Sequence, residues 1–135
     1  MSTEIDTGIW SHYNASAALK AALVNGLWDT NAPQSTNYPF GLFQIVSNTP
    51  NYNFSDDFED TLIQFKLFSD DKSSSAELDV MFDALKTTFD FAIITVTNHT
   101  TVSMIRQSAV KSKDENVWQY MVLYRLLLQR DVSVR

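Results

Sequence analysis

The last long apolar segment constrains the fold of this chain more than any other feature. Residues 117–128, VWQYMVLYRLLL, predict a strand because their side chains alternate between two faces, and both faces are largely apolar. One face carries Trp118, Tyr120, Val122, Tyr124, Leu126 and Leu128, and the other carries Val117, Gln119, Met121, Leu123, Arg125 and Leu127. A strand of this kind either lies centrally in a sheet that is covered on both sides or presents one face to another protein.

Further periodic segments predict the elements around this strand. An alanine-rich helix is expected at residues 9–24, ending at Asn25-Gly26, and a second helix is expected after Ser74, where Glu77 would complete a capping box. The second helix has an apolar stripe formed by Leu78, Met81, Phe82, Leu85 and Phe89. Strands are expected at residues 40–46, 61–69, 91–97 and 102–110, with a charged hairpin loop, KSKDEN, joining the last of these to 117–128. Residues 29–39 and 47–60 are expected to form long loops.

These elements predict a single α+β domain spanning residues 1–135, with a mostly antiparallel sheet, two helices packed on one sheet face and a long final β-hairpin. In the segment 61–69, Ile63, Phe65 and Leu67 share the face expected to lie in the core. The other sheet face would carry an apolar set with few charges: Leu62, Phe68, Met121, Leu123 and Leu127. Oligomerisation would cover that face economically, and the first helix or a long loop is the alternative cover.

Residue counts exclude most catalytic and metal sites. The 135 residues contain no cysteine, two histidines and three glycines, so thiolate sites, histidine-rich metal sites and glycine-rich phosphate loops are excluded. His12 is read as a surface or packing residue, and His99 as a polar turn residue. The acidic run Asp56, Asp57, Glu59 and Asp60 lacks the spacing and the glycine of an EF-hand. No catalytic residue, metal or cofactor is therefore expected, and the chain is not expected to be an enzyme.

The charge is uneven along the chain. The net charge is −6, with −9 over residues 1–99 and +3 over residues 100–135. Folding can intermix the two segments, or the imbalance can create an acidic side and a basic side that favour head-to-tail binding between copies. No apolar segment is long enough to span a membrane, and the polar start MSTEIDTG has no secretion signal, so the chain is expected to act in a cytoplasm.

The order of these motifs resembles the tail terminator, or tail-completion, proteins of long-tailed bacteriophages. The resemblance covers about residues 10–130 and rests on ASAALKAALVNGLWD (15–29), NAPQSTNYPFGLFQI (31–45), SDDFEDTLIQFKLFSD (55–70), SSSAELDVMFDALKTTF (73–89) and VSMIRQSAVKSKDENVWQYMVLYRLLLQR (102–130). The sequence departs from the family pattern in having few glycines after the first helix and none in the final turns. Its 91–97 segment is also more apolar than the family pattern. The resemblance implies a structural virion protein at the neck-proximal end of the tail, assembled in the host cytoplasm. It also implies a homohexameric ring that caps the tail tube, ends tube polymerisation and joins the tail to the head, without cofactor or catalysis.

The partners implied are other copies of the chain, the tail tube protein and a head-neck connector protein, with DNA only as cargo passing through the lumen. The interface candidates are an acidic-aromatic set, expected to meet the tube or a neighbouring copy, and three arginines, expected to meet an acidic surface. They are Tyr52, Asp56, Asp57, Phe58, Arg125, Arg130 and Arg135. The aromatic side chains of 47–60 could instead pack beneath their own loop. The alternative functions are another phage neck or head-completion ring protein, and a small monomeric binding domain or enzyme.

Overall fold

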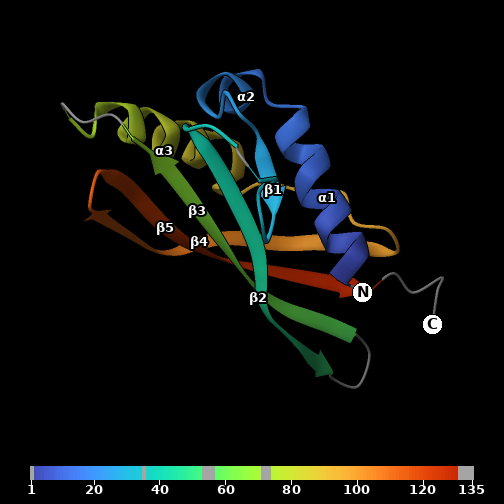
Figure 1. Ribbon diagram of the computed structural model, residues 1–135. Coiled ribbons are helices and arrows are strands. Elements are labelled where there is room, and N and C mark those ends of the chain that lie inside the picture. Colours follow the sequence, from blue (N-terminus) through green and yellow to red (C-terminus); the bar gives the residue numbers. More distant parts are fainter. Residues whose placement is uncertain (1, 35, 53–56, 71–73, 131–135) are drawn as a thin grey trace.

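The computed structural model describes residues 2–34, 36–52, 57–70 and 74–130, and it places the helices of these residues on one face of a five-stranded sheet (Figure 1). The elements are α1 (Ser2–Asn14), α2 (Ala17–Ala22), β1 (Leu27–Asp29), β2 (Phe40–Tyr52), β3 (Asp57–Ser69), α3 (Ala76–Phe89), β4 (His99–Asp114) and β5 (Val117–Arg130). The strand order is β1-β2-β3-β5-β4, with β1 parallel to β2 and every other pair antiparallel. The predicted α+β class is confirmed, with one helix more than expected.

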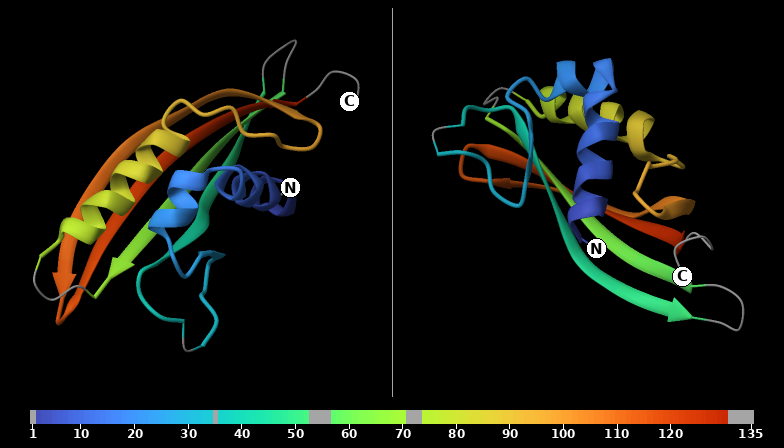
Figure 2. Two further views of the ribbon diagram at one scale, coloured as in Figure 1. Left: turned by 90° about the horizontal axis from the view of Figure 1, so that it is seen from above. Right: turned by 90° about the vertical axis from the view of Figure 1, so that its right-hand side faces the viewer.

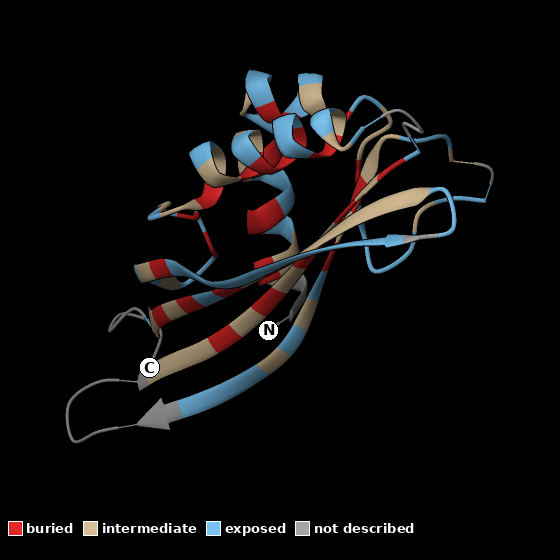
Figure 3. Ribbon diagram, turned by 90° about the vertical axis from the view of Figure 1, so that its left-hand side faces the viewer, coloured by how far each residue is buried: buried red, intermediate tan, exposed pale blue. Residues whose placement is uncertain are grey.

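The core lies between the helices and the sheet face that they cover (Figure 2). Ile63, Phe65 and Leu67 of β3 are fully buried there, as the alternation predicts. The predicted stripe of α3 is buried along its whole length. Helix surfaces that face the sheet are buried and their outer surfaces are exposed (Figure 3), so the packing matches the apolar periodicity of the sequence.

The first helical segment differs from the single helix predicted at 9–24. The chain is helical from Ser2, and the helix breaks after Asn14. Ser16 starts α2 as its N-cap, with its hydroxyl accepting a hydrogen bond from the Leu19 amide at 3.2 Å. Ile5 and Ile9 are fully buried, so core packing stabilises the first turns of α1. The polar residues around them are the reason that the sequence did not predict these turns as helix. Gly26 adopts a φ of +100°, as expected for the residue that turns the chain after the helix.

The long loop predicted at 47–60 is wrong, because most of this segment forms a β-hairpin. β2 continues to Tyr52 and β3 begins at Asp57, and the two pair antiparallel throughout, with one irregularity between Ile45 and Ser47. Polar residues and Pro50 made the segment resemble a loop. Strand pairing nevertheless continues because β3 is held on its other side by β5, from Phe58 to Ser69.

The strand predicted at 91–97 is also wrong. This segment is irregular, although Ile94 and Val96 are buried as alternate residues of an extended chain. It packs against α1 at Gly8, where an added Cβ would lie 2.6 Å from the Thr95 carbonyl oxygen. The β-branched composition therefore reflects burial beneath α1 and not membership of the sheet.

Two local details of the remaining elements were also mispredicted. The final hairpin is confirmed, but its strands extend through most of KSKDEN, leaving a turn at Glu115 and Asn116 in which Glu115 has a φ of +56°. The capping box of α3 is not formed, because Ser75 occupies the N-cap without a side-chain bond. Glu77 instead accepts a hydrogen bond from the buried Ser69 hydroxyl at 2.5 Å, which ties the helix to the end of β3.

Candidate functional site: the open face of the sheet

The sheet face opposite the helices is a candidate interaction surface of the described chain. No helix lies on this side in either view of Figure 2, and we call it the open face. Strand register places on it the side chains that alternate with the core residues, including Leu62, Gln64 and Lys66 of β3 beside Arg125, Leu123 and Met121 of β5. All of these except Arg125 are half-buried by their neighbours within the sheet. The open face is thus a mixed polar and apolar surface that none of the described helices covers.

An ion pair lies on the open face, toward the end of the sheet at which β3 begins. Arg125 donates from Nε and Nη2 to the two carboxylate oxygens of Asp60 at 2.8 and 2.6 Å. These hydrogen bonds lower the pKa of Asp60 and raise that of Arg125. Such a two-point contact fixes the plane of the guanidinium group, so the pair forms an ordered polar feature among apolar neighbours.

Aromatic side chains gather at one end of the open face. Phe40 of β2 and Phe68 of β3 are directly opposite in the register, and their rings stack with centroids 5.0 Å apart. The ring of Tyr38 lies 5.3 Å from that of Phe40 and is 37% exposed. Partly exposed aromatic rings of this kind are typical anchors of protein interfaces.

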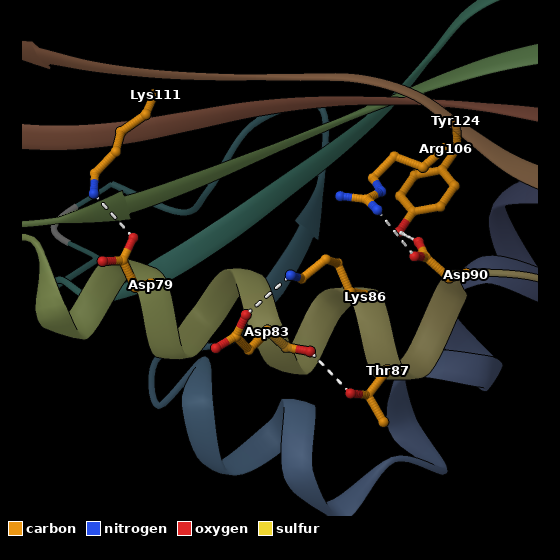
Figure 4. A network of polar contacts seen from close by, with 8 residues as sticks. All are labelled: Asp79, Asp83, Lys86, Thr87, Asp90, Arg106, Lys111 and Tyr124. Atoms are coloured by element: carbon orange, nitrogen blue, oxygen red, sulfur yellow. Dashed lines mark hydrogen bonds and ion pairs between the residues drawn. The ribbon is translucent and has the colours of Figure 1, made fainter.

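Several basic side chains of the C-terminal part pair with acids of the same chain. Lys111 contacts Asp79 of α3 at 2.9 Å, and Arg106 contacts Asp90 at 3.3 Å (Figure 4). Tyr124 also donates a hydrogen bond to Asp90. The pKa of the Tyr124 hydroxyl is raised, mainly because the group is buried and in addition because of this hydrogen bond. The fold therefore intermixes the acidic and basic segments of the sequence, and it uses these contacts to hold α3 on the sheet.

The interface residues expected from the sequence are distributed over different parts of the sheet. Phe58 is half-buried at the start of β3 on the open face, and Tyr52 pairs with Asp57 in the register at the end of the β2–β3 hairpin. Asp56 and Arg135 lie outside the described residues.

The two described arginines of this set do not share a face. Arg125 lies on the open face, whereas Arg130 is level with His99 on the helix side. A single basic surface formed by these two arginines is therefore absent from the described fold.

A buried polar contact at the start of β4 was missed in the sequence. The His99 side chain is only 4% exposed, and its Nε2 lies 3.1 Å from Oε2 of Glu59 on β3. Its Nδ1 lies 2.9 Å from the carbonyl oxygen of Thr97, which can only accept, so Nδ1 carries a hydrogen. The sequence separation of His99 and Glu59 concealed this contact, which links the start of β4 to the β2–β3 hairpin.

A second polar contact joins α1 to β1. Asp6 and Asp29 share a side-chain hydrogen bond, and burial together with this bond raises the pKa of Asp6 to about 6. Two carboxyl groups that share a hydrogen bond need a proton between them, since both cannot ionise without repulsion.

Among the described residues, the hollows on the helix side are lined by one titratable side chain, His12. A groove of about 170 Å³ lies between α1 and Thr95 of the irregular segment, and a second groove of about 320 Å³ lies where the end of α1, the start of α2 and α3 meet. His12 lines both grooves. His12 Nε2 lies 2.8 Å from the Thr88 carbonyl oxygen, and the other lining side chains are small or hydroxylic. Among the residues that the structure describes, no three His, Asp or Glu side chains come close enough to hold a metal ion. None of the described helices has both the length and the apolar character needed to cross a membrane.

Comparison with solved structures shows that the fold occurs in a phage-like particle. A chain of the virion of a native gene transfer agent particle superposes with a TM-score of 0.75 at 11% identity, covering 90% of this chain and 91% of that one. A second solved structure, named without a function, has a TM-score of 0.61 at 10% identity and covers 97% and 96% of the two chains. No protein-family model and no curated protein matches the sequence.

Proposed function

We propose that this chain is a structural virion protein that caps the tail tube as a ring, ends tube polymerisation and provides the surface that joins tail to head. The observation that carries the proposal is the shared fold, over 90% of this chain, with a chain of a gene transfer agent virion. The order of sequence motifs resembles tail terminators independently of that comparison.

The geometry of the described residues supports a role in assembly. A five-stranded sheet covered on one face leaves a broad surface for other proteins, and its partly exposed aromatic rings are suited to anchoring a partner. The β2–β3 hairpin extends well beyond the helices (Figure 1), so its end can reach a neighbouring copy or the tube. Tyr52, Asp57 and Phe58 lie in that part of the hairpin.

Deletion of the gene for this chain from the genome that carries it tests the proposal. Without a protein that ends polymerisation, tubes should vary in length and remain separate from DNA-filled heads in negative-stain electron micrographs. Expression of the intact chain from a plasmid should restore joined particles. Tails of uniform length beside heads that leak DNA would instead indicate a head-completion protein, and unaltered particles would rule out both roles.

Charge reversal at the hairpin end tests the predicted contact residues. The double variant Asp56→Lys, Asp57→Lys should fail to restore joined particles, whereas Asp83→Lys on the exposed side of α3 serves as the matched control. Full restoration by the hairpin variant would remove these two carboxylates from the interface.

A further inference from the structure

The two cationic side chains that β3 and β5 place on the open face differ in their partners. Arg125 is paired with Asp60 of the same chain. Lys66 of β3 has no hydrogen bond or ion pair with any residue that the structure describes, although its side chain is half-buried. Its ammonium group is therefore satisfied by water alone, and only while the open face stays uncovered.

Strand register places Lys66 in the middle of an apolar row that crosses the sheet. Lys66 is directly opposite Leu42 of β2 on one side and Met121 of β5 on the other. Leu42 is level with Trp28 of β1, and Met121 is opposite Val110 of β4. Trp28 and Val110 are 37% and 57% exposed, and the two side chains next to Lys66 are half-buried. We call these five residues the Lys66 row.

The strands of the open face offer Lys66 no acid of its own chain. β2 and β5 contain no acidic residue, and neither does β4 from His99 to Lys113. Within β3, Asp60 lies on the open face, but it is about 20 Å from Lys66 at about 3.3 Å per residue, and it is already paired with Arg125. The Lys66 row thus combines exposed apolar surface with one uncompensated positive charge.

This combination determines the chemistry of a partner. A partner that covers Trp28 and Val110 also removes water from Lys66 between them. An ammonium group that loses its water without gaining a negative partner costs free energy, so the partner has to supply that negative group. A nucleic acid would supply phosphates but would leave the apolar side chains of the row unburied, and a single cation attracts it weakly. A protein surface with a carboxylate between apolar side chains satisfies both parts of the row.

The extent of the open face is sufficient for such a contact. β3 and β5 pair from Phe58 to Ser69, which is about 40 Å at roughly 3.4 Å per residue, and β2, β3, β5 and β4 lie side by side at about 4.8 Å spacing. The resulting area of roughly 600–800 Å² is close to the ~800 Å² that each partner contributes to a standard protein interface.

We propose that the open face binds a different virion protein, whose contact surface places a carboxylate between apolar side chains and pairs it with Lys66. The proposal rests on the proposed function in taking this partner to be a component of the particle. A second copy is less suited, because Asp79 and Asp83 of α3 are already paired with lysines of their own copy.

Carbodiimide coupling of purified particles tests the contact, because this reagent joins an amine to a carboxylate only where the two groups meet. After proteolysis, mass spectrometry should identify Lys66 linked to an Asp or Glu of another virion protein. Lys86 and Asp83, which lie 3.1 Å apart within one copy, provide the internal control for the coupling.

Charge reversal provides a second readout in the same particles. Lys66→Glu should lower the yield of joined particles by about tenfold or more, because two carboxylates would then face each other. Lys66→Arg should keep most of the yield, and Lys20→Glu on the exposed surface of α2 is the matched control. Changing the linked carboxylate of the partner to Lys should restore the yield of Lys66→Glu, which misfolding of that variant would prevent.

The outcomes separate this inference from the proposed function. Particles that contain the chain and show the Lys86–Asp83 link, but no link at Lys66, would overturn the inference and leave the virion role intact. A link from Lys66 to a second copy would overturn it, as would a DNA band shift by the purified chain that Lys66→Glu abolishes. Particles that lack the chain would contradict the virion role and, with it, this inference.

Discussion

The two faces of β5 are similarly apolar in sequence but differ in their surroundings. Leu126 points toward the helices and is fully buried, whereas its neighbour Leu127 points to the open face and is half-buried. The covered face packs aromatic rings of different elements together, as where Phe65 lies 4.8 Å from Phe89 and 5.6 Å from Tyr124 between ring centroids. The open face carries the partly exposed Asp60–Arg125 pair. The covered face is therefore expected to determine stability, and the open face to determine what the protein binds.

Shortening the two neighbouring leucines should separate these roles. Leu126→Ala should lower the free energy of unfolding by about 2–5 kcal/mol, because it leaves a cavity in the core. Leu127→Ala should lower it by about 1 kcal/mol or less, because its side chain is already partly in water. Urea unfolding of both variants measures the difference. Equal losses would show that the open face is as fully packed as the core.

Removal of the Tyr124 hydroxyl should have a smaller effect on the covered side. Tyr124→Phe should cost about 1–2 kcal/mol, because Asp90 loses a hydrogen bond but keeps Arg106. The same change in an Asp90→Ala background should cost much less, as a double-mutant cycle of unfolding free energies would show.

The raised pKa of Tyr124 has its own consequence for stability. Because the hydroxyl keeps its proton in the folded state at pH values where the unfolded state loses it, stability should fall as the pH rises above about 10. Tyr124→Phe should weaken this fall.

The Asp6–Asp29 contact should give the smallest effect and a distinctive pH dependence. With a pKa of about 6 in the folded chain against 3.8 for a free side chain, Asp6 binds more protons when folded. Its favourable contribution is therefore complete below about pH 4 and is lost as the pH rises to about 6. Asp6→Asn should flatten the stability profile over this range and stabilise the chain at pH 7 by less than about 1 kcal/mol, since solvent screens the pair. A steeper profile in the variant would contradict this account.

Periodic segments of the sequence predicted their structure well. The stripe of α3 and the alternation in β3 and β5 each report one packed face, and the structure places them as expected. The hairpin end was mistaken for a loop because its polar and proline residues are locally unfavourable in a strand. Pairing with β3, and of β3 with β5, outweighs that local preference.

Most features of the candidate surface depend on the tertiary structure and could not be predicted from the sequence. The sequence predicted an apolar second sheet face, but the choice between cover by the chain itself and cover by another protein required the positions of the helices. The contact between His99 and Glu59 and the pairing of Arg106 with Asp90 join residues far apart in the chain. The exposure of Phe91 and Ile93 was likewise hidden, because an apolar segment predicts burial unless its neighbours are known.

The amino-acid sequence by itself determined the class of fold and which faces of β3, β5 and α3 pack into the core. It also determined that the chain has more apolar surface than one core requires. These properties follow from side-chain periodicity, which depends only on local geometry. The tertiary structure alone decided which charges are paired, which face stays open and which side chains lie at the two sheet edges. These depend on contacts between distant segments, whose free energy is set by packing and desolvation at the place where they meet.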